Sequence, residues 1–115
     1  MIVRVLTRAG HEIIESPDGV DGLRKFHSEA PAVVITDIMM PHRDGIETIR
    51  EMRETGSTIG IIAISGGGRG RGTLYLTLSK EFGADAIIQK PFFPEEITTV
   101  LDQLLDRLRA EGRQA

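Results

Sequence analysis

The chain has 115 residues, the size of one domain that can bury its own hydrophobic core. Its 14 basic and 17 acidic side chains give a net charge of −3, which argues against a nucleic-acid-binding surface. The absence of cysteine excludes disulfides and thiolate metal sites. No apolar run approaches the ~18 residues of a membrane span, and no signal-peptide pattern opens the chain, so we expect a soluble cytoplasmic domain.

The first segment, residues 1–9, fits two kinds of secondary structure. Its β-branched side chains favour a strand. The spacing of Ile2, Leu6 and their neighbours, with Gly10 just after them, favours a helix. A strand here would leave only about four residues before the next predicted strand, at 11–15, too few for a parallel crossover. We therefore prefer the helix.

A turn at residues 16–19 leads into a second predicted helix, which carries Val20, Leu23 and Phe26 on one face. Residues 33–35 follow as a β-branched run without alternation, which is typical of a strand covered on both faces. Asp37 ends this run.

Residues 44–64 predict a further helix and strand. Asp44 is placed to cap a helix that carries Ile46, Ile49 and Met52 and ends at Gly56. The run 60–64 is an apolar strand, and Ser65 follows it.

The next segment, residues 66–72, contains five glycines. The spacing from Gly67 to Gly72 fits a phosphate-binding Walker A loop, but Thr73 stands where that motif requires lysine. A flexible loop before a helix over residues 74–82 is the preferred interpretation.

The last predicted strand covers residues 85–89, and Lys90-Pro91 stands at its end. Pro94 then starts the clearest helix of the chain. Its apolar stripe consists of Ile97, Val100, Leu101, Leu104, Leu105 and Leu108. The predicted domain is therefore residues 1–108, and residues 109–115 form a polar tail.

Polar side chains follow three of the predicted strands. Strands that alternate with helices form a parallel sheet, whose carboxyl ends share one edge. That edge would collect Asp37, Ser65 and Lys90. A carboxylate can attack phosphorus, an ammonium can offset charge on the transferring oxygens, and a hydroxyl can donate a hydrogen bond. The competing interpretation is three unrelated polar residues at strand ends.

Several separated motifs resemble one family, in the family's order. They are Ile35-Thr36-Asp37-Ile38-Met39-Met40-Pro41 with Asp44-Gly45, then Ala63-Ile64-Ser65, Gly83-Ala84-Asp85 and Lys90-Pro91-Phe92. The chain resembles a receiver domain of the two-component response-regulator family, which implies a flavodoxin-like open parallel sheet with helices on both faces.

The resemblance also implies roles for individual residues. Asp37 would be the phospho-acceptor, Ser65 the switch hydroxyl and Lys90 the phosphate-sensing lysine, with a cis bond between Lys90 and Pro91. Asp37 and the backbone carbonyl of Met39 would contact Mg²⁺. Such a domain catalyses phosphoryl transfer to its own aspartate without being an ordinary enzyme.

The chain departs from the family pattern in three places. It begins at what matches the helix after the first, central strand, so that strand and its pair of Mg²⁺-binding acids are missing. Mg²⁺ binding should then be weak, with Glu15 or Asp18 as a candidate substitute. The missing strand would leave a gap of about 10 Å beside residues 33–35. Ile87 stands where the family usually has an aromatic switch residue.

Two functions remain open. The first is a stand-alone receiver that accepts phosphate from a histidine kinase or phosphotransfer protein and acts on an effector protein, without a DNA-binding domain or membrane contact. The alternative is a receiver-like scaffold that no longer takes phosphate. A haloacid-dehalogenase-type phosphatase is disfavoured because Met39 replaces the second acid of its Asp-x-Asp motif. We also expect reduced stability, or a sheet completed by another chain, for example in a homodimer.

Overall fold

The structure, a computed structural model, describes residues 2–37, 45–65, 81 and 83–113. Within these residues three parallel strands lie in the order β1-β2-β3. The strands are β1 (Val33–Asp37), β2 (Gly60–Ser65) and β3 (Ala86–Gln89). Four described helices flank them: α1 (Ile2–Arg8), α2 (Gly19–Glu29), α3 (Gly45–Glu54) and α5 (Pro94–Ala110). None of the described helices is long and apolar enough to cross a membrane.

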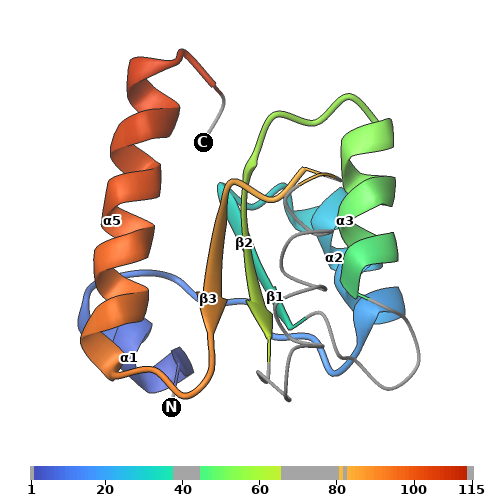
Figure 1. Ribbon diagram of the computed structural model, residues 1–115. Helices are drawn as coiled ribbons and strands as arrows, with labels where there is room; N and C mark the ends of the chain where they lie inside the picture. Colours follow the sequence, from blue (N-terminus) through green and yellow to red (C-terminus); the bar gives the residue numbers. More distant parts are fainter. Residues whose placement is uncertain (1, 38–44, 66–80, 82, 114–115) are drawn as a thin grey trace.

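The sheet is the middle layer of three (Figure 1). Helices α1 and α5 lie on one side of it, and α2 and α3 lie on the other. The side chains of β2 alternate between these layers: Ile62 and Ile64 pack with α1 and α5, whereas Ile61 and Ala63 pack with α2 and α3. This alternation follows from the two-residue period of a strand, and it makes β2 the buried centre of the fold.

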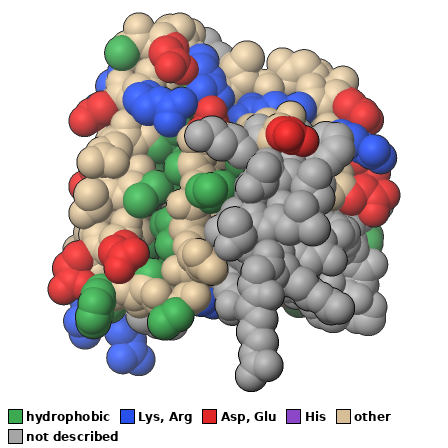
Figure 2. Space-filling view, viewed as in Figure 1, with side chains coloured by type: hydrophobic (Ala, Val, Ile, Leu, Met, Phe, Trp, Pro, Cys, Tyr) green, Lys and Arg blue, Asp and Glu red, His purple; other side chains and the backbone are tan. Residues whose placement is uncertain are grey.

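Helix α5 buries four of the six residues of the stripe predicted from its sequence, and the other two, Val100 and Leu105, are half-buried against the core. Ile97, Leu101, Leu104 and Leu108 are at most 5% exposed. Figure 2 shows apolar side chains along the seam beside α5, with charged side chains mostly around them. The helix runs two residues beyond the predicted boundary at 108, because Arg109 and Ala110 continue its hydrogen-bonded turns.

The ends of the other helices are set by local chemistry. Asp18 caps α2 by accepting a hydrogen bond from the Asp21 N–H at 2.9 Å. Helix α1 confirms the preferred helix for the first segment of the chain over the alternative strand. Gly10, after this helix, has a φ of 94°, a backbone angle that glycine adopts without strain. Gly56, after α3, has a φ of 83° for the same reason.

The prediction of a strand at residues 11–15 is wrong. These residues have no regular secondary structure, and no backbone hydrogen bond joins them to the described part of β1. A strand needs a ladder partner, and the sequence itself predicts a gap at this place. Ile13 still packs against the core, while Ile14 is 46% exposed.

The predicted face of α2 is correct at Leu23 and Phe26, which pack in the core beside α3. Val20 is 57% exposed and belongs to neither core cluster of the described residues. It stands on the first turn of the helix, where no described element covers it.

Several predictions fall on parts of the chain outside the described residues. These are the positions of Met39, Pro41 and Asp44, the glycine-rich segment 66–72, and the helix expected over residues 74–82.

Candidate phosphoryl site at the carboxyl edge of the sheet

Asp37 is the last residue of β1, and the strand register defines what lies beside it. Asp37 is level with Ile64 on β2, and Ser65 is level with Gln89 on β3. Lys90 comes directly after Gln89. The three sequence-predicted residues therefore stand at the same edge of the sheet, because parallel strands end together.

The structure brings Asp37 and Lys90 into direct contact. The Lys90 ammonium donates a hydrogen bond from Nζ to Asp37 Oδ2 over 2.9 Å. The Lys90–Pro91 peptide bond is cis, as the resemblance implies. Both side chains remain open to solvent, with 37% of Asp37 and 45% of Lys90 exposed. An incoming phosphoryl group could therefore reach the carboxylate.

A second carboxylate–cation cluster lies at the opposite, amino end of the sheet, just before β3. Here Asp85 accepts a two-pronged contact from Arg113, with Nη1 2.8 Å from Oδ1 and Nη2 3.0 Å from Oδ2. Arg53 Nη2 and the Ile61 N–H also donate to Oδ2, at 3.0 and 2.9 Å. The Asp85 side chain is only 10% exposed. We call Asp85, Arg53 and Arg113 the amino-end cluster.

The two arginines of this cluster also bind backbone carbonyls. Arg53 donates to the carbonyls of Ser57, Ile59 and Gly83, and Arg113 donates to those of Thr58 and Ile59. Residue 113, in the predicted polar tail, is therefore tied into the domain. Sequence reasoning missed this cluster. Its one signal was Asp85, a charged residue placed directly before a buried strand.

The environment of the cluster shifts the pKa of each member. Burial alone would raise the pKa of Asp85, but hydrogen bonds from Arg113 and the Ile61 N–H, with the charges of both arginines, lower it. Burial lowers the pKa of Arg53, although the charge of Asp85 opposes it. The hydrogen bond to Asp85 raises the pKa of Arg113. All three groups stay charged at neutral pH.

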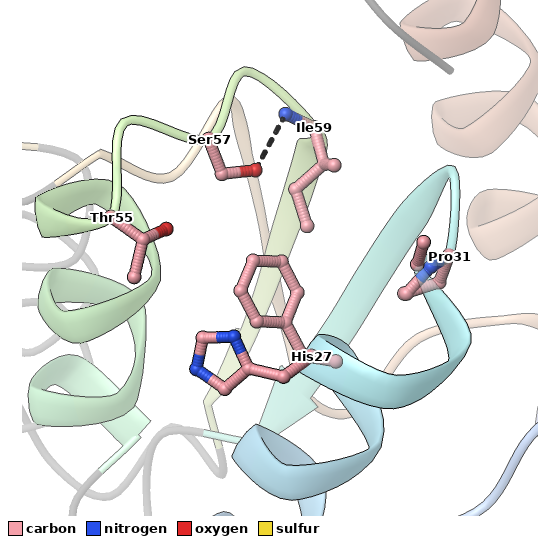
Figure 3. Close-up of a pocket in the computed structure, with 7 residues that line it drawn as sticks. His27, Pro31, Thr55, Ser57 and Ile59 are labelled. Atoms are coloured by element: carbon pink, nitrogen blue, oxygen red, sulfur yellow. Dashed lines mark hydrogen bonds between the residues drawn. The ribbon is translucent and has the colours of Figure 1, made fainter.

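A shallow cavity of about 360 Å³ also lies at the amino end, between the last turns of α2 and α3 (Figure 3). The Ser57 Oγ in its wall accepts a hydrogen bond from the Ile59 N–H at 3.3 Å, and Thr55 donates to the Met52 carbonyl at 2.6 Å. These hydroxyls are already engaged within the chain. The lining residues are Phe26, His27, Ala30, Pro31, Thr55, Ser57 and Ile59. The cavity shares no residue with the phosphoryl site.

The sequence matches the profile of the response regulator receiver domain over residues 1–102. It is 30% identical over 102 residues to the alkaline phosphatase synthesis transcriptional regulatory protein PhoP of Bacillus subtilis (strain 168), covering 89% of this chain and 41% of that protein. It is 37% identical over 103 residues to the probable transcriptional regulator ycf27 of Galdieria sulphuraria, covering 90% and 39%. The chain thus spans about two fifths of these relatives.

The fold agrees with solved receiver structures. A response regulator receiver domain protein (CheY-like) from Methanospirillum hungatei JF-1 superposes with a TM-score of 0.85. The match covers 96% of this chain and 86% of that chain at 24% identity. This likeness supports the three-layer architecture with a parallel sheet.

Receiver domains generally bind Mg²⁺ at the phosphorylation site, but the described residues do not fit such a site. Mg²⁺ is usually held through one or two carboxylates in a near-octahedral oxygen shell. Among the last residues of the three described strands, Asp37 is the one carboxylate. No group of three acidic or histidine side chains that could hold a metal ion forms within the described part of the chain. Asp18, a candidate substitute, caps α2.

Proposed function

We propose that Asp37 is the phosphoryl acceptor of this chain, which belongs to the response regulator receiver domain family. The donor would be a phosphohistidine of a histidine kinase or phosphotransfer protein in the cytoplasm, and the phosphorylated form would act on an effector protein. The observation that carries this proposal is the 2.9 Å contact between Lys90 Nζ and Asp37 Oδ2 at the exposed carboxyl edge.

The proposed chemistry is the transfer of a phosphoryl group from a phosphohistidine of the donor to the free carboxylate of Asp37. A carboxylate oxygen of Asp37 forms a bond to phosphorus while the bond from phosphorus to the donor imidazole nitrogen breaks. The electron pair of that bond stays on the imidazole. Lys90 offsets the negative charge on the transferring oxygens, because its ammonium already lies within hydrogen-bond distance of the attacking carboxylate.

Phosphorylation also changes what Lys90 can bind. The free carboxylate of Asp37 carries the charge that pairs with Lys90, and the acyl phosphate moves the negative charge to the phosphoryl oxygens. The ammonium of Lys90, at the end of β3, would then pair with the phosphoryl oxygens. Ser65, at the end of β2, is proposed as the hydroxyl donor to the same oxygens. Both strands would then respond to the phosphoryl group.

Acetyl phosphate, a small acyl phosphate donor, tests the proposal directly. Intact-protein mass spectrometry should show one added phosphoryl group, and borohydride trapping followed by peptide mapping should locate it at Asp37. The Asp37→Asn variant should gain no mass. Asp106→Asn is the matched control, because Asp106 also contacts a cation, Arg109, at 3.1 Å on the surface. An Asp37→Asn protein that is still phosphorylated contradicts the assignment.

A receiver-like scaffold that takes no phosphate is the second candidate. It is favoured by the absence, among the described residues, of any group of three acidic or histidine side chains that could hold a metal ion. A metal ion neutralises charge in phosphoryl transfer, but a chain that binds Mg²⁺ weakly gains little from it. The rate at which acetyl phosphate phosphorylates the chain should therefore respond little to Mg²⁺ in the millimolar range. No phosphorylation of the wild-type chain by acetyl phosphate or a phosphohistidine donor, at any Mg²⁺ concentration, would favour the scaffold.

A further inference from the structure

Strand β3 carries a polar side chain one residue before Lys90. Ala86 and Ile88 of this strand pack in the cluster beneath α1 and α5, and Ile88 is 4% exposed. Because side chains alternate along a strand, Ile87 and Gln89 lie on its second face. Ile87 is 39% exposed, and Gln89 is exposed as well. Both residues on the second face of β3 are therefore open to solvent.

Gln89 is level with the residue that we propose as the hydroxyl donor. The parallel register pairs it with Ser65 on β2. Neighbouring strands lie about 4.8 Å apart, a spacing that a glutamine side chain can bridge. Among the described residues no hydrogen bond engages the Gln89 amide. Its two N–H donors and its carbonyl acceptor are therefore available to a new partner.

The other residue on this face of β3 cannot make such a contact. Ile87 is level with Ala63, two residues before Ser65 on β2. The side chains of Ile87 and Ala63 are hydrocarbons, without a donor or an acceptor for a hydroxyl group. Gln89 is therefore the position on the second face of β3 that can exchange a hydrogen bond with Ser65.

We propose that Gln89 is a positioning residue, which donates a hydrogen bond from Nε2 to Ser65 Oγ when Asp37 is phosphorylated. A serine hydroxyl has one donor and two acceptor sites. With Oγ accepting from Gln89, its hydrogen is free to donate to a phosphoryl oxygen. This inference rests on the proposed function, and it adds that the exposed amide of Gln89 becomes engaged on phosphorylation. The second face of β3 would then differ between the two forms of the chain.

The phosphoryl group supplies the reason for the amide to change partner. Hydrogen bonds to charged oxygens are roughly twice as strong as neutral ones. Hydrogen bonds in a chain also polarise one another, so donation from Gln89 makes the Ser65 hydroxyl a better donor. In the unphosphorylated chain the charge lies on Asp37 and pairs with Lys90. The Gln89 amide then gains little by leaving solvent, which agrees with its exposure in the structure.

Side-chain amide resonances test this inference, because the chain has three glutamines and no asparagine. The glutamines are Gln89, Gln103 and Gln114. In a nitrogen–proton correlation spectrum of the full chain, acetyl phosphate with Mg²⁺ should shift the Gln89 pair and slow its exchange with water. Gln103, exposed on α5, is the internal reference and should not move. A Gln89→Met variant assigns the pair. A Gln89 pair that stays in place in a chain phosphorylated at Asp37 overturns the inference.

A Ser65→Ala variant separates hydroxyl positioning from a general effect of added charge. At a matched extent of phosphorylation its Gln89 pair should not shift, because no Oγ is present to accept. An equal shift in wild type and variant would mean that Gln89 responds to the phosphoryl charge by itself, and overturns the inference. Intact mass of the same samples reports phosphorylation separately. A wild-type chain that gains no phosphoryl group contradicts the proposed function, whereas a phosphorylated chain with an unmoved Gln89 contradicts this inference alone.

Phosphorylation rates give a second measure. Gln89→Met removes the amide and keeps the length of the side chain. It should slow phosphorylation by acetyl phosphate about fivefold, the worth of one neutral hydrogen bond. Gln103→Met is the matched control and should keep the wild-type rate. In the Ser65→Ala chain, Gln89→Met should cause no further loss. An equal loss in both backgrounds overturns the inference, since Gln89 would then act without Ser65.

Discussion

The two ends of the sheet hold the same kind of charge pair in different surroundings. At the carboxyl edge Lys90 contacts Asp37 at 2.9 Å, with 45% and 37% of the side chains exposed. At the amino end Arg113 contacts Asp85 at 2.8 Å, with 19% and 10% exposed. The distances are almost equal, so distance alone does not distinguish the roles of the two pairs.

The two carboxylates, Asp85 and Asp37, differ in their hydrogen bonding and in their exposure to solvent. Asp85 has donors on both carboxylate oxygens, and its arginines also bind the carbonyls of the loop before β2. Such a carboxylate is held in place and shielded from reagents. Asp37 keeps more than a third of its side chain in solvent. The amino-end cluster thus stabilises the fold, and the carboxyl edge is available for chemistry.

The largest expected effect is on stability, from Asp85→Asn. Removing this charge leaves the mostly buried Arg53 without the carboxylate it contacts at 3.0 Å, and leaves Arg113 with the half-exposed Glu111 at 3.1 Å. Breaking a buried pair in this way typically costs about 3–5 kcal/mol. Urea denaturation should show that loss in the free energy of unfolding. The exposed control Asp106→Asn should change it by no more than about 0.5 kcal/mol. Equal effects of the two variants would show that burial does not distinguish the clusters.

A smaller loss is expected from Gly83→Ala. An added Cβ would lie 2.6 Å from Arg53 Cγ, and the backbone φ of 127° is strained for any side chain. We expect a loss of about 1–3 kcal/mol in thermal or urea unfolding. Gly10→Ala is the control, because its φ of 94° is also positive but no atom lies within 4 Å of its added Cβ. If both variants lose the same stability, crowding of Arg53 contributes nothing.

Acid should weaken the amino-end cluster. The pKa of Asp85 is lowered in the folded chain from its ordinary 3.8. Its ionised form therefore adds stability that is fully present above about pH 4 and is lost as the pH falls through the lowered pKa. The stability difference between wild type and Asp85→Asn should shrink in that range. Asp21, whose pKa is lowered to about 2, is present in both proteins and cancels in the comparison. A constant difference would contradict the assigned shift.

The smallest effect should come from the exposed pair at the carboxyl edge. Lys90→Met and Asp37→Asn should each change the free energy of unfolding by no more than about 1 kcal/mol, since solvent screens the pair. A double-mutant cycle should give a weak coupling that falls further with added salt. A coupling as strong as that between Asp85 and Arg113 would mean that both ends of the sheet serve stability.

The sequence by itself determined the features that depend on local pattern. The period of α5, the apolar runs of β2 and β3, and the placement of Asp37 and Lys90 at strand ends follow from residues close together in the chain. The family motifs added the cis bond before Pro91. These features follow from short-range sterics and side-chain periodicity, which a sequence carries directly.

Tertiary structure decided the features that depend on distant partners. Residues 11–15 have a strand-like composition but do not form a strand, because no described neighbour pairs with them. Arg53, Asp85 and Arg113 meet only after α3, β3 and the end of α5 have packed together. The half-burial of β1 likewise reflects what lies beside it. Periodicity predicts which residues prefer burial, but only the packed neighbours decide which of them are covered and which charges meet.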